Sequence, residues 1–186
     1  MRLLRRWWSW SGLSHHRAGE TEKLIQGVLA LDVASVQAAL DSPRVDCNAQ
    51  ILPPLVIQPR TLLQHAVLSE HPALVDCLLT AGADPMRVTD QTFWPAPHLA
   101  TLLECRPVLE RLMASTAALF DEKVLDPLVG ERSSCRDIAA RRGRAFTEWF
   151  SQFFALTEAA RPPTWTPEED PMFIRKPRLH RRSAHR

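Results

Sequence analysis

The chain has 186 residues, the size of one domain or of a short repeat array, and a formal net charge of +2. Its contents of 45% hydrophobic and 24% charged residues are enough to build a buried core, which excludes a wholly disordered chain. No apolar run reaches the roughly 18 to 20 residues that a membrane-spanning helix needs.

The small net charge hides an uneven distribution along the chain. Residues 1–19 carry four arginines and no acid, and residues 175–186 carry six basic residues and no acid. Between them, residues 20–174 hold 13 basic and 21 acidic residues, a net charge of −8. We therefore predict an acidic body with two basic ends.

Residues 1–21 are predicted to be a basic amphipathic N-terminal segment. On a helical wheel, one half of residues 1–10 is apolar and holds Met1, Leu3, Leu4, Trp7, Trp8 and Trp10. This pattern fits a mitochondrial presequence, or an anchor that contacts an anionic membrane or organelle import machinery through residues 1–13. A short tail without structure is the alternative, because helices under roughly 12 residues are marginal in water.

Residues 61–86 contain the most informative pattern of the chain. Apolar residues at helical spacing predict two short helices, one over 62–68 and one over 72–80. Pro72 suits the first turn of the second helix, and Gly82 suits the left-handed conformation that ends a helix. The segment therefore predicts a helix, a turn, a second helix and an extended exit.

This segment resembles the ankyrin repeat, which combines a TPLHxA start, a Val-x-x-Leu-Leu second helix and a GAD exit at a period near 33 residues. The matching positions are Thr61, Leu63, Ala66, Val75, Leu78, Leu79, Gly82, Ala83 and Asp84. Weaker copies in the same phase begin near residues 22, 95 and 134. The resemblance covers residues 22–156 and implies an all-α, ankyrin-like helix-turn-helix repeat solenoid with long inter-repeat finger loops.

Two insertions interrupt the period. Residues 50–60 contain three prolines and are predicted to form an enlarged hairpin finger rather than a helix. Residues 114–133 are predicted to be a second, irregular insertion. Insertions in repeat arrays lie on one face, often the binding face.

The resemblance implies that a partner protein binds in a concave groove formed by the finger tips and by the first helix of each repeat. The predicted partner-binding residues are Ile57, Gln58, Arg60, Leu68, Gln91, Trp94, Leu102, Leu103, Arg141 and Arg142. Trp94, Leu102 and Leu103 would form an apolar centre flanked by arginines, a composition common in binding hot spots. Two alternatives stay open: Phe93 and Trp94 pack against their own helix, and the arginines of 141–144 form a solvated helix end.

The sequence offers little that indicates catalysis or a cofactor. The four cysteines, Cys47, Cys77, Cys105 and Cys135, form no close pair of the kind that binds zinc, and we expect them to be buried as small hydrophobes. The six glycines form no phosphate-binding loop. We expect a non-enzymatic protein with no metal, no cofactor and no small-molecule substrate.

Residues 157–186 are predicted to be a Pro-rich linker followed by a basic tail. The tail, residues 175–186, is of the kind that engages nucleic acid or an import receptor through its charge.

Taken together, the patterns predict an intracellular scaffold or adaptor that binds another protein, with cytoplasmic localisation. The alternatives are a mitochondrial or membrane-surface adaptor directed by the N-terminal segment, and a nuclear or nucleic-acid-associated protein that uses the basic tail.

Overall fold

The computed structural model describes residues 15–90 and 92–160, with the backbone alone described at 15–18 and 116–117. This part of the chain is mainly helical, with two small antiparallel sheets of two strands each. The elements in chain order are α1 (His15–Leu29), α2 (Val33–Leu40), β1 (Gln50–Ile51), β2 (Arg60–Thr61), α3 (Leu62–Leu68), α4 (Pro72–Thr80), α5 (Ala96–Leu103), α6 (Arg106–Thr116), η3 (Ala117–Asp121), β3 (Val124–Asp126), β4 (Glu131–Ser133), α7 (Cys135–Arg142) and α8 (Arg144–Ala160). Residues 1–14, which hold most of the predicted basic amphipathic segment, and the predicted basic tail of residues 175–186 lie outside the described residues.

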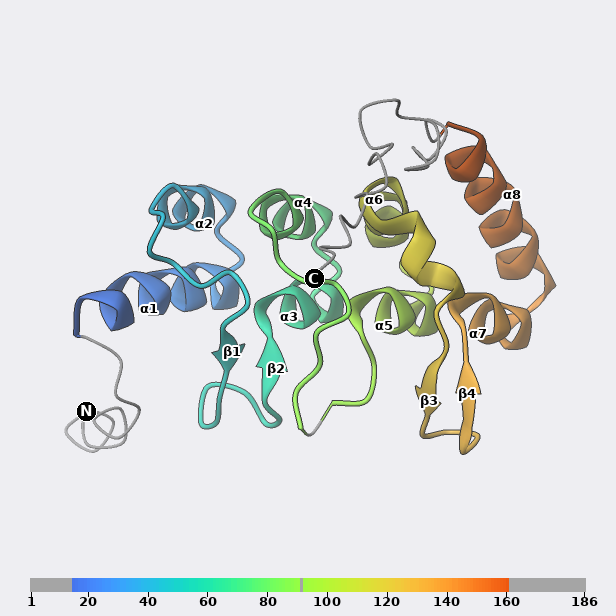
Figure 1. Cartoon of the computed structure of the whole chain (residues 1–186), viewed down its shortest axis with the longest axis horizontal. Helices are drawn as coiled ribbons and strands as arrows, with labels where there is room; N and C mark the ends of the chain where they lie inside the picture. Colours follow the sequence, from blue (N-terminus) through green and yellow to red (C-terminus); the bar gives the residue numbers. More distant parts are fainter. Residues whose placement is uncertain (1–14, 91, 161–186) are drawn as a thin grey trace, which may run out of the picture.

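The helices lie in two rows (Figure 1). The row nearer the hairpins holds α1, α3, α5 and α7, and the other row holds α2, α4, α6 and α8. Each helix contacts its partner in the same consecutive pair and the next helix in its own row. Most contacts therefore join elements that are close in sequence.

Three helices begin directly after the residues that the sequence pattern selected as starts. The Thr61 hydroxyl caps α3 by accepting a hydrogen bond from the Gln64 backbone amide, and the Gln64 side-chain oxygen accepts one from the Thr61 backbone amide, which together form a capping box. Ser134 and Asp137 form the same arrangement at α7. Pro95 precedes α5 without a side-chain cap. These caps satisfy amides that have no partner within the helix.

The outer limits of the helical part differ from the predicted limits of 22 and 156. Helix α1 begins at His15, because residues 15–21 are helical although they lack the apolar spacing on which the sequence prediction relied. It ends at Leu29, and Asp32 caps α2. At the other end, α8 continues to Ala160, past the predicted start of the linker.

The turn within each helix pair contains one residue with a positive φ angle. These residues are Leu31 (55°), Glu70 (51°), Glu104 (56°) and Gly143 (129°). They are separated by 39, 34 and 39 residues, the same intervals as the predicted starts. A left-handed residue at this point reverses the chain direction between the two helices of a pair. Gly82 also has the predicted left-handed conformation, with φ of 86°.

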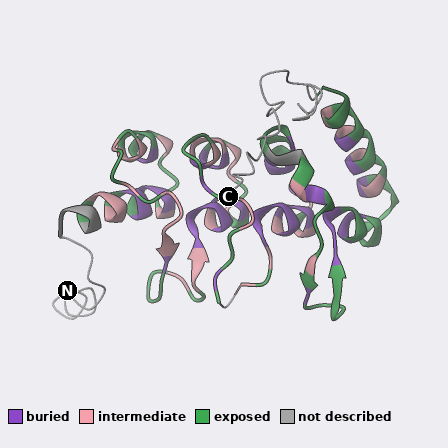
Figure 2. Cartoon of the chain, viewed as in Figure 1, coloured by how far each residue is buried: buried purple, intermediate pink, exposed green. Residues whose placement is uncertain are grey.

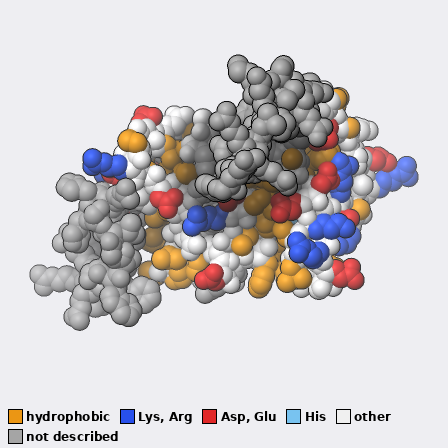
Figure 3. Space-filling model, in the orientation of Figure 1, with side chains coloured by type: hydrophobic (Ala, Val, Ile, Leu, Met, Phe, Trp, Pro, Cys, Tyr) orange, Lys and Arg blue, Asp and Glu red, His pale blue; other side chains and the backbone are white. Residues whose placement is uncertain are grey.

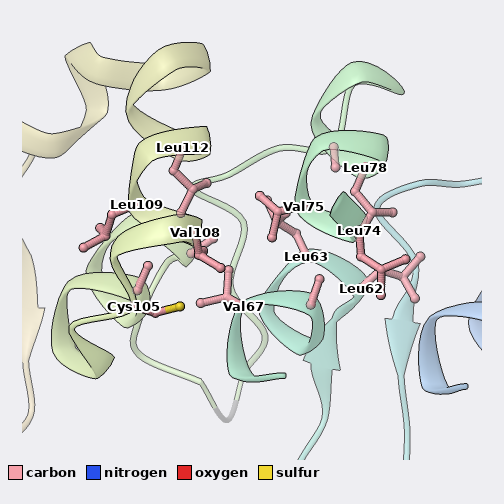
Figure 4. Close-up of a cluster of buried hydrophobic side chains, with 14 of the residues drawn as sticks. Leu62, Leu63, Val67, Leu74, Val75, Leu78, Cys105, Val108, Leu109 and Leu112 are labelled. Atoms are coloured by element: carbon pink, nitrogen blue, oxygen red, sulfur yellow. The ribbon is translucent and has the colours of Figure 1, made fainter. Parts of the chain in front are cut away.

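The core lies between the two rows of helices, where buried residues face one another (Figure 2). Figure 4 shows its central part, where α3, α4 and α6 direct apolar side chains toward one another. The labelled residues of this part are Leu62, Leu63, Val67, Leu74, Val75, Leu78, Cys105, Val108, Leu109 and Leu112. Burying each such leucine or valine contributes about 1.5 to 3 kcal/mol to folding.

Aromatic side chains pack helix α8 against η3. The rings of Phe120, Phe150 and Phe154 are buried, with centroids 6.1 to 6.3 Å apart. Aromatic pairs at this separation add attraction to that of the buried area.

The two insertions are both hairpins. Strands β1 and β2 pair with Gln50 opposite Thr61, which confirms the predicted finger. Residues 114–133 are more regular than predicted: α6 continues to Thr116, η3 follows, and β3 pairs with β4, with Asp126 opposite Glu131. The hairpin turn closes at Gly130, which has φ of 74° and whose amide donates to the Asp126 carbonyl at 2.8 Å. The sequence analysis missed this hairpin because residues 114–133 contain one proline, whereas three prolines indicated the hairpin over residues 50–60.

None of the helices among the described residues has both the length and the apolar character needed to cross a membrane.

Candidate functional site

Three loops project from the row that contains α1, α3, α5 and α7 (Figure 1). We call them finger 1 (residues 50–61), finger 2 (residues 84–95) and finger 3 (residues 122–133). Finger 1 contains the β1–β2 hairpin, finger 3 contains the β3–β4 hairpin, and finger 2 has no strand in its described residues. They lie side by side along one edge of the molecule.

Finger 2 is held in place by Gln64, a buried residue of α3. The Gln64 Nε2 group donates to the Trp94 carbonyl at 2.9 Å and to the Thr92 hydroxyl at 3.1 Å. The Thr89 hydroxyl in turn donates to the Pro59 carbonyl of finger 1 at 3.0 Å. Fingers 1 and 2 are therefore fixed both to α3 and to each other.

Finger 3 is held by residues of α5 and α7. The His98 Nε2 atom of α5 lies 3.0 Å from the Glu122 carbonyl, at the start of the finger. The buried Asp126 carboxylate accepts from the Leu128 amide at 2.9 Å and pairs with the Arg141 guanidinium of α7. Arg141 also donates to the Ser133 hydroxyl at 3.2 Å. Buried charges are tolerated when they are paired and hydrogen-bonded in this way.

The fingers carry most of the exposed large hydrophobic side chains of the described residues. Eight such residues lie on the three loops: Leu52, Leu55, Ile57, Val88, Phe93, Leu125, Leu128 and Val129. Ile57 is the most exposed of them, at 93%, followed by Leu128 at 71%. Figure 3 shows hydrophobic side chains along the lower margin of the molecule, where Figure 1 places the fingers. Apolar groups gathered on one edge in this way indicate a contact surface.

A hollow of about 300 Å³ lies between fingers 1 and 2 and helices α3 and α5. Its lining residues are Gln58, Arg60, Gln64, Leu68, Thr92, Phe93, Trp94 and Leu99. Four of the predicted partner-binding residues, Gln58, Arg60, Leu68 and Trp94, are thus brought together.

The other predicted residues lie in different surroundings. Ile57 is at the tip of finger 1, Leu102 is half-buried on α5, and Leu103 is 38% exposed at the end of α5. Gln91 lies outside the described residues.

The two predicted arginines of α7 are engaged in ion pairs. Arg141 binds Asp126 as described above, and the Arg142 Nε atom lies 2.8 Å from a Glu104 carboxylate oxygen. Arg141 therefore anchors finger 3, and Arg142 links the end of α7 to the end of α5. The sequence analysis predicted Arg141 as a partner-binding residue beside an apolar centre. It did not predict the pair of Arg141 with Asp126, because the sequence does not show which acidic residue lies near Arg141 in the folded chain.

Trp94 combines features of both interpretations left open by the sequence. Its carbonyl is bound by Gln64 and its side chain is half-buried, as expected for packing, while the residue also lines the hollow. The neighbouring Phe93 is 55% exposed and lines the hollow, whereas the sequence analysis named it only in the packing alternative.

Sequence reasoning also missed the apolar residues of finger 3. Leu125, Leu128 and Val129 lie in a segment interpreted as an irregular insertion. The available signal was the pair Pro127 and Gly130, which are residue types that favour turns, beside these three apolar residues.

Burial shifts the pKa of two histidines and three cysteines in the direction that favours the neutral form. Burial lowers the pKa of His98, and burial together with the charge of Arg60 lowers the pKa of His65. Burial raises the pKa of the Cys135 thiol to about 12, and it also raises the pKa of Cys105 and Cys47. Residues 15–90 and 92–160 contain no group of three or more His, Cys, Asp or Glu side chains arranged to hold a metal ion.

No protein-family model matches this chain, and no curated protein matches it significantly.

Proposed function

We propose that this chain is an ankyrin-like repeat array that acts as an interaction scaffold, binding another protein through its fingers and the adjoining ends of its first helices. The array interpretation is supported by the four consecutive helix pairs and by the positive-φ residues at intervals of 39, 34 and 39. The hairpin fingers at the two long intervals support it as well. Repeat arrays stack units in this way because no single unit can bury its apolar face alone.

The observation that carries the binding role is the set of eight exposed hydrophobic residues on the three fingers. These loops are not loosely placed, because buried hydrogen bonds from Gln64 and the Asp126–Arg141 pair fix two of them to the helices. A rigid scaffold that presents apolar side chains loses little conformational entropy on binding. Such an edge suits a protein partner with a complementary apolar surface.

Site-specific photo-crosslinking tests this proposal. A photo-reactive amino acid in place of Ile57, in the full chain, should crosslink a partner in a lysate of the source organism. The same amino acid in place of Leu156, which is 68% exposed on α8 and lies away from the fingers, is the matched control. The crosslinked species should disappear when Leu128→Ser is added on finger 3. Equal crosslinking from positions 57 and 156 would contradict the proposal.

A further inference from the structure

The hollow between fingers 1 and 2 is lined by four apolar and four polar residues. The apolar lining residues are Leu68, Phe93, Trp94 and Leu99, and the polar lining residues are Gln58, Arg60, Gln64 and Thr92. Gln64 and Thr92 are already hydrogen-bonded to each other and to the backbone of finger 2. Arg60 is the charged residue among them, and a ligand that fills the hollow would contact it.

Arg60 differs from the ion-paired arginines of the molecule. Its Nε atom donates a long hydrogen bond of 3.4 Å to the Gln58 carbonyl, and it forms no ion pair within the described residues. Five other arginines are ion-paired there: Arg111, Arg136, Arg141, Arg142 and Arg144. A half-buried guanidinium beside an apolar hollow has unused capacity for a carboxylate.

A second polar group beside Arg60 also lacks a partner. The Nδ1 atom of His65, on α3, is buried and has no hydrogen bond. Arg60 lies close enough for its charge to disfavour the protonated form of this imidazole. A negative group placed beside Arg60 would offset that repulsion.

The size and charge of the surroundings decide which ligand fits. A volume of about 300 Å³ is at the lower end of binding pockets and suits one bulky side chain. The three fingers together hold four basic and five acidic residues, so they lack the basic cluster that binds phosphate backbones. A protein segment is therefore favoured over nucleic acid.

We infer that the hollow receives a bulky apolar side chain of a partner segment, while a carboxylate within about three residues of that side chain pairs with Arg60. This inference rests on the proposed interaction function and names the chemistry of the partner at one part of that surface. An extended segment advances about 3.3 to 3.6 Å per residue, so residues one to three positions apart lie within about 11 Å of each other and can both contact one small hollow.

Selection from a random dodecapeptide phage library on the full chain tests the inference. The enriched peptides should share Trp, Phe or Leu within three residues of Asp or Glu. For an enriched peptide labelled with fluorescein, Arg60→Gln should weaken binding about tenfold in a polarisation assay. Arg87→Gln, which removes an exposed arginine of finger 2 outside the hollow, is the matched control and should leave the affinity unchanged.

A double-mutant cycle identifies the partner of Arg60. Replacing the acidic residue of the peptide by its amide should weaken binding about tenfold, and combining this change with Arg60→Gln should weaken it no further. Additive effects, enriched peptides without an acid, an absence of enriched peptides, or equal competition by single-stranded polyuridine would each overturn the inference. None of these results affects the crosslinking test at Ile57, which lies outside the hollow and judges the proposed function separately.

Discussion

Two buried polar residues perform the same task at equivalent positions of successive helix pairs. Gln64 is the third residue of α3 and binds finger 2, and His98 is the third residue of α5 and binds finger 3. Each residue lies three positions after a predicted start, at 61 or 95, although one side chain is an amide and the other an imidazole. What the position requires is a side chain that reaches the backbone of the next finger from a buried site.

The imidazole at this position should make stability depend on pH. Burial lowers the pKa of His98 in the folded chain, so below about pH 6.5 the unfolded chain binds the proton more readily. The contribution of neutral His98 to the free energy of unfolding is therefore complete above about pH 6.5. It is lost as the pH falls toward the pKa of His98 in the folded chain, by at most about 1.4 kcal/mol per pH unit. Urea denaturation at pH 7, 6 and 5 should show this loss.

The variant His98→Gln places at α5 the residue type that α3 uses, and it should flatten the decline. His65, whose pKa is also lowered, should account for part of the slope that remains. An identical pH dependence in the wild type and the variant would show that His98 does not titrate on unfolding.

At the scale of single elements, the fingers depend on long-range anchors more than on their own strands. The two hairpins have strands of two and three residues, too short for independent stability. Finger 3 relies on the buried Asp126 carboxylate, which joins the turn amide of Leu128 to the Arg141 guanidinium. A solvent-exposed pair such as Arg144–Glu148 on α8 lacks this role.

We expect Asp126→Ala to lower the free energy of unfolding by about 2 kcal/mol, because it leaves Arg141 without its carboxylate and the Leu128 amide without an acceptor. Hydrogen exchange over residues 124–133 should accelerate at the same time. The control Arg144→Ala removes an exposed pair within one helix and should change stability by about 0.5 kcal/mol or less. Equal losses in the two variants would mean that the buried pair does not anchor the finger.

At the scale of the whole molecule, contacts run mainly between neighbouring helix pairs. Helices α1 and α2 contact the pair α3–α4, and the last pair contacts α5, α6 and η3. If the proposed array is correct, its stability is the sum of terms for each pair and for each interface between neighbours. A destabilising substitution in the first helix pair should then unfold that pair and leave the last helix pair folded.

The variant Val36→Asp tests this expectation. Val36 is fully buried in α2, and a carboxylate there should unfold α1 and α2 while the amides of α7 and α8 keep their protection from hydrogen exchange. Ala38→Asp places the same charge on the exposed side of α2 and is the control. Uniform loss of protection along the chain would contradict an array of locally stabilised pairs.

Much of the helical part was predictable because its signals act over three or four residues. Thr61 with Gln64 and Ser134 with Asp137 are capping pairs that can be recognised in the sequence, and Gly82 and Gly143 lie where a helix must end. The start of α1 was not predictable in this way, because residues 15–21 lack apolar spacing.

The candidate site was predictable only in part. Gln58, Arg60, Leu68 and Trp94 were selected because repeat position determines which side of a helix or finger a residue occupies. The sequence did not show which polar groups would have a hydrogen-bond or ion-pair partner in the folded chain. Arg141 meets Asp126 across 15 residues and Gln64 meets Trp94 across 30, whereas Arg60 meets no acid among the described residues.

There is a physical reason why the helices could be predicted from the sequence and the partners of the polar groups could not. Capping and apolar periodicity are local signals, because each depends on residues that are three or four positions apart in the chain. The pairing of Arg141, the burial of Gln64 and the exposure of the finger hydrophobics depend on how the helix pairs stack. Stacking brings some charged and apolar groups to a partner within the chain, and it leaves Arg60 and the apolar residues of the fingers on the surface.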